Sequence, residues 1–423
     1  MRKSINLSIF YFLFIFILIY IFFSQVFRGY QKDSWQITEF LINYQGGFVR
    51  RGLLGEILLT LYNLFGANPY KTILFLCASA YLVLAVFFIK SFLKHGYPIF
   101  ILPFVFFLGN PIINDFWVRK DVLISLIFIS TIYFSTKKSG LYLILVNLFF
   151  IMGLLIHESI GFFGFPILFL MLLNKNKIEN TSIKSISISL FQLLPSVITF
   201  LSVLYYKGSQ TVADLIWNSW KPVVFPLPAK DDSQIPQAID MLSWSLKQGL
   251  LITADILKNF NDGIYAPIAW LLIILLIYYL LTNTDKLNVK ILNYEPKNNF
   301  NKTTISNTLI LQLFSVIPLF ILGCDYGRWI FLWVTSSFAV IILIPDKISS
   351  DMFPQFVSAI STKLNIILDS ILSNSKGFMF LLCLIIGFPQ YGWNLILSVY
   401  SSAIIIVLDF ISRIIFLLGK LFF

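Results

Sequence analysis

The sequence predicts an all-α, polytopic membrane protein of about twelve transmembrane helices, with two long non-cytoplasmic loops that carry short surface helices. Hydrophobic residues make up 58% of the 423 residues and charged residues only 12%, which is outside the range of soluble globular proteins. Many apolar runs reach about 17–22 residues, enough to cross a hydrocarbon core of roughly 30 Å. Because backbone in lipid must satisfy its own hydrogen bonds, we expect these runs to be helices.

Basic residues set the expected topology. Arg2 and Lys3 place the N-terminus in the cytoplasm, and the short inner connections carry further lysines, as the positive-inside rule requires. The expected spans include Ser8–Phe27, Tyr97–Phe107 and Ser185–Tyr206, and a C-terminal part with an amphipathic helix at Phe356–Leu372 and spans at Phe378–Leu397 and Ala403–Leu418. We therefore expect a main membrane module, residues 1–350, and a C-terminal part, residues 351–423.

The two long outer loops are expected at residues 28–70 and 207–262. In the first, Ser34 precedes a short amphipathic pattern, and a second pattern follows the Gly46-Gly47 pair. We expect two short helices there, lying along the outer membrane surface. The second loop contains several prolines and one helical stretch near Ile239–Asn259. A loop of this length in a compact protein is usually a lid or a binding element.

The net charge of +11 does not indicate a nucleic-acid-binding protein. Much of the positive excess lies in short connections between spans, where it anchors loops to the cytoplasmic side, and no basic stripe with stacking aromatics runs through a soluble region. The three cysteines make neither a disulfide framework nor a metal site, because two lie inside apolar runs and Cys324 stands alone. The bilayer is therefore the expected environment, and nucleic acid is excluded as a partner.

Charged motifs fall at one end of the apolar spans. Ionisable groups near membrane depth are costly, so clusters of them indicate a functional site. The predicted topology brings all of them to the non-cytoplasmic surface. The abundance of Ile, Phe, Asn and Lys is typical of an AT-rich bacterial genome, so we expect this surface to be the outer or periplasmic face of the cytoplasmic membrane. The four motifs are Tyr44–Glu56, Asn114–Asp121, His157-Glu158-Ser159 and Gly323–Trp329.

The basic residues of these motifs suit a phosphate group. Arg50 and Arg51 offer fork-shaped donors that match phosphate oxygens, and Arg119 and Lys120 are placed to hold a pyrophosphate leaving group. Asp115 or Asp121 would orient them or hold a divalent ion, although the sequence requires no metal. The alternative is an interfacial salt-bridge cluster.

Three carboxylates are candidates for the catalytic base. Asp33, at the start of the first outer loop, is the first choice because a carboxylate there would take the proton of a hydroxyl acceptor; the alternative is a turn residue or a helix cap. Glu56 and Asp325 come next. Asp325 and Arg328, three residues apart, share one face of a helical turn, so they are either functional or a structural ion pair.

The remaining candidates belong to the histidine motif and the first loop. His157 either contacts phosphate or is a core residue, and Glu39 and Glu158 are expected in supporting roles. No second histidine follows His157 at helical spacing, which excludes the metalloprotease zinc motif.

This layout resembles the GT-C superfamily of membrane glycosyltransferases. The resemblance covers residues 1–350 at the level of topology: a first span, a long outer loop with an early carboxylate (Asp33, then Glu39 and Glu56), and a second long outer loop after the seventh span. It implies a sugar donor on a polyprenyl phosphate or diphosphate, inverting transfer to a glycan or lipid acceptor, a loop carboxylate as base or metal ligand, and basic residues on the lipid phosphate. The first loop contains no Asp-Glu or Asp-x-Asp pair.

Two other functions remain open. An O-antigen or capsular polysaccharide polymerase uses the same class of donor on the same face and also has two large outer loops. A lipid-linked sugar flippase or other transporter is the third class, but transporters usually place charges near the midplane and show internal repeats, neither of which is found here. In each case the expected partners are a lipid-linked sugar and the bilayer.

Overall fold

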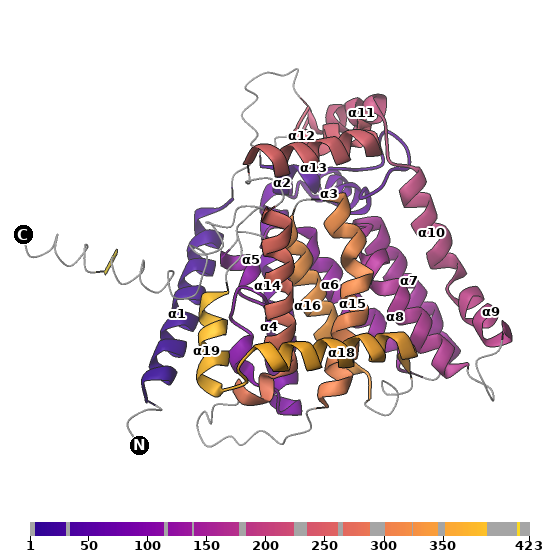
Figure 1. Ribbon diagram of the computed structural model, residues 1–423. Coiled ribbons are helices and arrows are strands. Elements are labelled where there is room, and N and C mark those ends of the chain that lie inside the picture. The colour runs from indigo at the N-terminus through magenta and orange to yellow at the C-terminus, as the bar shows by residue number, and fades with distance from the viewer. Residues whose placement is uncertain are drawn as a thin grey trace, which may run out of the picture.

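The computed structural model describes residues 5–30, 34–113, 117–137, 139–176, 183–223, 235–260, 265–287, 301–323, 325–345, 352–386 and 413–414. Every regular element in these residues is a helix, which confirms the all-α prediction. Most of the helices run side by side as a bundle, and a layer of shorter helices lies across one end of it (Figure 1). The bundle comprises α1 (Ile5–Arg28), α4 (Pro69–His95), α6 (Lys120–Ser135), α7 (Gly140–Ile156), α8 (Ser159–Lys175), α9 (Ile183–Gln192), α10 (Leu194–Tyr205), α14 (Tyr265–Thr282), α15 (Lys302–Leu322) and α16 (Tyr326–Leu343).

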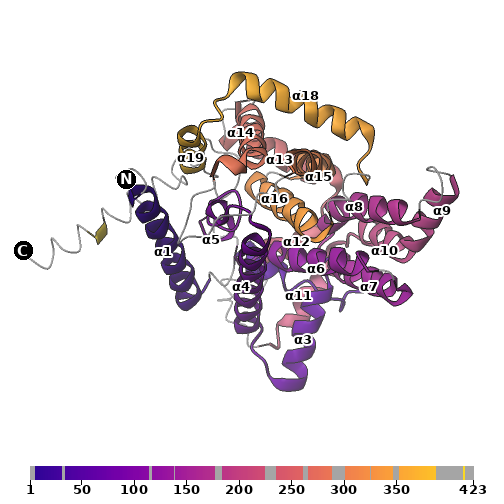
Figure 2. The ribbon, with the colours of Figure 1, turned by 90° about the horizontal axis from the view of Figure 1, so that it is seen from below.

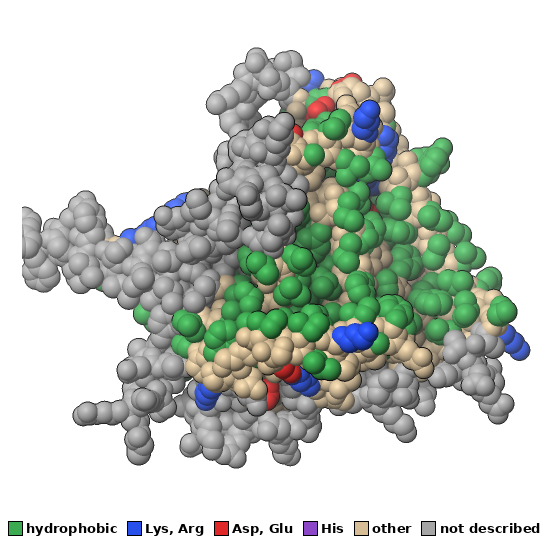
Figure 3. Space-filling view, viewed as in Figure 1, with side chains coloured by type: hydrophobic (Ala, Val, Ile, Leu, Met, Phe, Trp, Pro, Cys, Tyr) green, Lys and Arg blue, Asp and Glu red, His purple; other side chains and the backbone are tan. Residues whose placement is uncertain are grey.

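Three helices are long and apolar enough to cross a membrane, namely α4, α15 and α16. The number rises to five if α9 with α10, and α18 (Gln355–Ile371) with α19 (Lys376–Ile385), each form one bent span. Several shorter apolar helices, including α7 and α8, accompany them, so the expected twelve spans are only partly matched. Hydrophobic side chains gather on the visible face between the end layer and α18 (Figure 3), as expected for a surface in contact with lipid.

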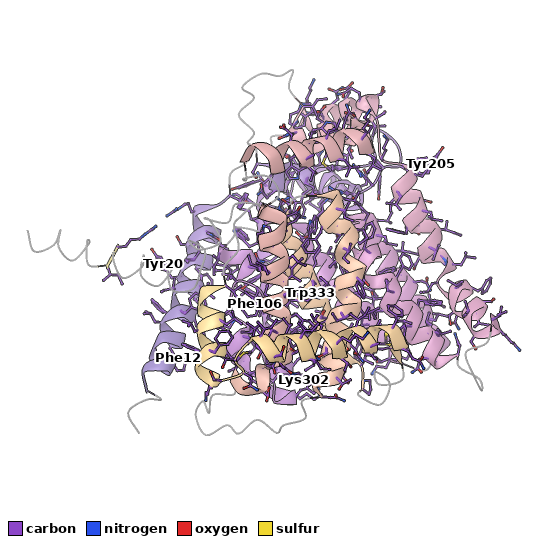
Figure 4. All side chains as sticks on the ribbon, viewed as in Figure 1. Phe12, Tyr20, Phe106, Tyr205, Lys302 and Trp333 are labelled. Carbon is purple, nitrogen blue, oxygen red and sulfur yellow. The ribbon has the colours of Figure 1, made fainter. Side chains whose placement is uncertain are left out.

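The central helix is α16, in which every residue from Tyr326 to Ile341 is buried. Trp333 lies in the interior of the bundle (Figure 4), where its indole Nε1 donates a 2.8 Å hydrogen bond to the carbonyl of Leu309 on α15. A helix surrounded in this way positions the residues at its ends with little freedom, because neighbouring helices pack against it on all sides.

Local signals in the sequence set the ends of the longest helix, α4. The side chain of Asn68 caps its N-terminus by accepting from the Lys71 amide, and Pro69 occupies the first helical position, where no amide donor is needed. At the other end Gly96 adopts a left-handed conformation, with φ of 73°.

Two segments far apart in the sequence form the layer across one end of the bundle, which we call the end layer. Trp220 donates from Nε1 to the Leu41 carbonyl at 2.7 Å, and Asn43 donates from Nδ2 to Ser219 Oγ at 2.8 Å. Residues of the two predicted outer loops are therefore locked together, while the membrane side that they face stays a prediction. The layer consists of α2 (Trp35–Glu39), α3 (Leu53–Phe65), α11 (Gln210–Trp220), α12 (Gln237–Asp240), η2 (Met241–Ser243) and α13 (Leu246–Phe260).

One expected surface helix is buried. Ser34 caps α2 as the sequence suggested, but all residues from Gln36 to Glu39 are buried, including the polar ones. The reason is that α12 packs over α2. The amphipathic pattern of α2 cannot reveal that a helix about 200 residues further along the chain covers it.

The span expected at Tyr97–Phe107 is wrong. This segment forms a short 3-10 helix, η1 (Ile99–Ile101), and a series of turns that lead into α5 (Asn110–Ile113). Pro98, Pro103 and Pro111 explain the difference, because each removes an amide donor and disfavours continued helix. The turns are nevertheless buried between helices, which is where irregular backbone is tolerated at membrane depth.

The C-terminal helices pack on the bundle. α18 runs across the bundle helices, near the end opposite the end layer, where Lys302 is also found (Figures 2 and 4). Its inner side is polar: Ser361 Oγ donates to Asn307 Oδ1, and Asn365 Nδ2 donates to Ser306 Oγ at 3.0 Å. Beside it, α19 contacts α14 and η3 (Thr284–Leu287). The boundary at residue 350 stays a prediction, as do the spans after residue 386, which fall almost wholly outside the described residues.

Replacing Gly55 in α3 by alanine is expected to destabilise the end layer by about 1–3 kcal/mol. A Cβ there would lie 2.0 Å from the Ile42 carbonyl oxygen, and backbone cannot move aside as a side chain can. Thermal unfolding in detergent would measure the effect. Gly140→Ala, where a Cβ meets nothing within 4 Å, is the control; an unchanged Tm for Gly55→Ala would contradict the packing.

Candidate functional site

Three of the four charged motifs meet Glu39 of α2 beneath the end layer. They come from the turn before α3, from the start of α6 and from the connection between α7 and α8. Ion pairs and hydrogen bonds join them into one group, which we call the charged cluster. Its members are Glu39, Arg50, Arg51, Arg119, Lys120, His157 and Glu158.

Arg51 holds the charged cluster together. Its guanidinium contacts Glu158 through two nitrogens, with Nε 2.8 Å from Oε2, and donates from Nη1 to Glu39 Oε1 at 3.0 Å. Its backbone has φ of 65°, the only positive value for a non-glycine residue in the described chain. Backbone strain of this kind persists only where the surroundings enforce it, and it occurs preferentially at functional sites. Here it aims one guanidinium at two carboxylates.

Glu39 is the innermost carboxylate, with a side chain 1% exposed. Besides Arg51, it faces Arg119 Nη1 at 3.5 Å and His157 Nε2 at 3.6 Å. Burial alone would raise the pKa of the Glu39 carboxyl, but the charges of Arg51, Lys120, His157 and Arg119 outweigh it and hold the pKa well below its usual 4.5. Glu39 is therefore ionised at neutral pH.

The positive charge of the cluster is only partly paired. The Arg119 side chain is 3% exposed, yet its Nε and Nη1 have no hydrogen-bond partner. Arg50 has an unpartnered Nε as well and meets Glu158 only at 3.8 Å. Lys120 donates from Nζ to the Arg51 carbonyl at 3.1 Å and lies over the Phe40 ring. Buried donors without acceptors are costly, so this arrangement is suited to receive an anion.

His157 is neutral in this environment. Burial, reinforced by the charge of Arg51, lowers the pKa of its imidazole to about 4. Its Nδ1 accepts from the Ser159 amide at 3.2 Å, so the proton is on Nε2, which faces Glu39. The cluster thus contains four cations and two carboxylates among the described residues, an excess of two positive charges.

The fourth motif forms a separate triad nearby, in which Asp325 and Arg328 are joined by Asp121 of the second motif. Arg328 donates from Nε to Asp121 Oδ2 at 2.8 Å and from Nη2 to Asp121 Oδ1 at 3.1 Å, while its Nη1 pairs with Asp325. This bidentate contact joins the start of α6 to the start of α16. Because Asp121 follows Lys120 directly, the triad fixes where α6 presents Lys120 to the charged cluster.

Two predicted site residues, Asp33 and Asp115, lie outside the described residues. A third, Glu56, is described and belongs to neither group. It accepts hydrogen bonds from the Tyr44 amide at 3.0 Å and from Gln45 Nε2 at 3.0 Å, which stabilises the turn before α3. Its carboxylate is therefore engaged in the end layer, and its catalytic role stays a prediction without support from these contacts.

The sequence did not single out two residues around the cluster. Phe40 faces Lys120, and Asn110 donates from Nδ2 to the Gly327 carbonyl at 2.7 Å. Ser159, part of the predicted histidine motif, is fully buried and its hydroxyl has no hydrogen-bond partner. Asn110 lies close to the motif Asn114–Asp121, and its polar side chain at a span end was the available signal. Nothing in the sequence distinguishes Phe40 among 45 phenylalanines.

Within the described residues, no group of three or more His, Cys, Asp or Glu side chains is arranged to hold a metal ion. The guanidinium groups of Arg50 and Arg119, with their unpartnered nitrogens, and the ammonium group of Lys120 are suited to binding an oxyanion. Comparisons of the chain with protein-family models, with curated proteins and with solved structures find no match.

Proposed function

We propose that the protein is a membrane glycosyltransferase that takes a sugar from a polyprenyl-phosphate or polyprenyl-diphosphate donor, with inversion, during assembly of a cell-surface glycan. The observation that carries the proposal is the partly unpaired positive charge buried at one end of an apolar bundle. A lipid-linked phosphate combines an apolar chain with an anionic head, and such a ligand matches both parts.

The charge of the cluster suits the leaving group. When the glycosidic bond breaks, negative charge grows on the departing phosphate, and preorganised donors stabilise that charge. Arg119 contributes two nitrogens that have no hydrogen-bond acceptor in the structure, and Arg50 and Arg51 offer planar guanidinium groups. Lysine at these positions would supply charge without the paired geometry of two parallel hydrogen bonds.

Asp33 remains our first choice for the base. Glu39 and Glu158 are ionised but engaged with arginines, and Glu56 is engaged with the Tyr44–Gln45 turn. Asp33 directly precedes Ser34, the cap of α2, and α2 presents Glu39 to the cluster. In the proposed step the acceptor hydroxyl gives its proton to Asp33, its oxygen bonds to the anomeric carbon, and the phosphate departs with the bonding electrons.

Asp33→Asn is expected to reduce the release of free polyprenyl phosphate from a polyprenyl-phosphate sugar donor by at least about 100-fold, the usual contribution of a positioned base. Because the amide has nearly the shape of the carboxylate, expression and Tm should stay close to wild type. The assay uses purified protein with donor and acceptor. Asp214→Asn, an exposed position on α11, is the control and should behave as wild type.

The same assay separates the alternative functions. A ladder of products would indicate a polysaccharide polymerase, which uses the same donor class. Movement of intact donor across vesicles without any release of polyprenyl phosphate would indicate a flippase and would contradict the transferase.

A further inference from the structure

We infer that the phosphate of the ligand binds at the Arg50–Arg51 edge of the charged cluster, and that the Glu158 carboxylate occupies this position until the phosphate displaces it. The inference rests on the proposed function only in that the ligand carries a phosphate. It names Arg50 and Arg51 as the residues that first contact the phosphate, and it assigns Glu158 as an internal competitor for them.

Exposure identifies the open edge of the cluster. The side chain of Glu39 is 1% exposed and that of Arg119 is 3% exposed, whereas Glu158, Arg51 and Arg50 are 11%, 14% and 24% exposed. A ligand that enters the cluster therefore meets Arg50, Arg51 and Glu158 before it meets the inner residues.

The contacts of Glu158 are those that a phosphate would make. Its oxygens receive two guanidinium nitrogens of Arg51 in the paired geometry by which arginine binds both carboxylate and phosphate. Arg50 Nη1 and His157 Nδ1 each lie 3.8 Å from a carboxylate oxygen, too far for hydrogen bonds. A phosphate has more oxygens than a carboxylate, so it can keep the contacts with Arg51 and also satisfy Arg50.

Glu39 cannot play the same part. It is enclosed by Arg51, Arg119 and His157, and it keeps the Arg51 side chain oriented through Nη1. If Glu158 withdraws, Arg51 retains this contact and presents Nε and Nη2 to the ligand. The two carboxylates thus divide their roles: Glu39 orients Arg51, and Glu158 fills the site in the absence of ligand.

The test is the affinity of purified protein for inorganic pyrophosphate, measured by calorimetry. Glu158→Asp keeps the charge but shortens the side chain by one methylene, so the carboxylate reaches Arg51 less well. We expect pyrophosphate to bind roughly tenfold more tightly to this variant, a change of ~1.4 kcal/mol. Glu158→Gln should bind at least as tightly, and Arg50→Gln should bind more weakly than wild type.

Asp214→Asn is the matched control, since it removes an exposed carboxylate of the end layer that belongs to neither charged group. Tighter binding by folded Glu158→Asp, with Asp214→Asn close to wild type, supports the inference. Unchanged or weaker binding by Glu158→Asp, an equal gain in Asp214→Asn, or no binding by any variant overturns it. Because this assay needs no sugar transfer, its result is independent of whether polyprenyl phosphate is released.

Discussion

Replacing Glu39 by glutamine is expected to lower the free energy of unfolding by about 3–5 kcal/mol, the usual cost of removing one partner from a buried ion pair. The carboxylate is enclosed and faces Arg51, Arg119 and His157, so its loss leaves cationic groups buried without compensation. Chemical unfolding of the purified protein in detergent would measure the change. An unfolding free energy equal to that of wild type would show that Glu39 is not the centre of the cluster.

Glu56→Gln is the control for this variant, because Glu56 is also a carboxylate of the end layer but accepts only from an amide and a glutamine side chain. Its loss should cost about 1.5–3 kcal/mol, the contribution of hydrogen bonds to a charged group. The difference between the two variants separates the charge of the cluster from general disturbance of the layer.

The effect of Glu39→Gln should depend on pH. The pKa of Glu39 in the folded chain is held well below 4.5, its value in the absence of neighbours, so the unfolded chain takes up the proton first. The stabilisation is therefore fully present above that value and is lost as the pH falls below it towards the folded pKa. We expect the stability difference between wild type and variant to shrink on acidification below about pH 4.5.

Removing Arg328 is expected to lower the free energy of unfolding by about as much as Glu39→Gln does. Arg328→Ala leaves Asp121, whose side chain is 2% exposed, without its bidentate partner and also frees Asp325. The expected loss is about 3–5 kcal/mol of stability, because an unpaired buried carboxylate must either stay charged in an apolar site or take up a proton. Unfolding of purified protein would measure it, and binding of pyrophosphate should weaken as α6 shifts.

Lys302→Ala is the control that tests whether the stability lost in Arg328→Ala results from the burial of its ion pair. Lys302 pairs with Asp369 at 3.1 Å, but the two side chains are 39% and 41% exposed. Exposed ion pairs contribute about 0–1 kcal/mol. If Arg328→Ala and Lys302→Ala lose stability equally, burial does not strengthen the ion pairs of the triad between α6 and α16.

The charged motifs were recognisable from the sequence because the free-energy cost of an ionised side chain depends on whether apolar residues flank it. A charge beside an apolar run must be paired or useful, and this signal needs no knowledge of the fold. It identified Arg51, Arg119, His157 and Glu158, which the structure joins in one cluster. The pairing among them was not predictable, since each contact joins segments separated by more than 60 residues, except those along the first loop and within the His157-Glu158 pair.

Composition and the length of the apolar runs by themselves determined the helical class, because a backbone in an apolar medium has few other ways to satisfy its hydrogen bonds. Only the tertiary structure decided that Glu39 is central while Glu56 supports a turn, since both occupy polar positions of short helical patterns. It also decided that residues 97–107 form a short 3-10 helix and buried turns rather than a span. The reason is physical: periodicity reports which residues avoid water, whereas the packing of distant segments determines which charge meets which.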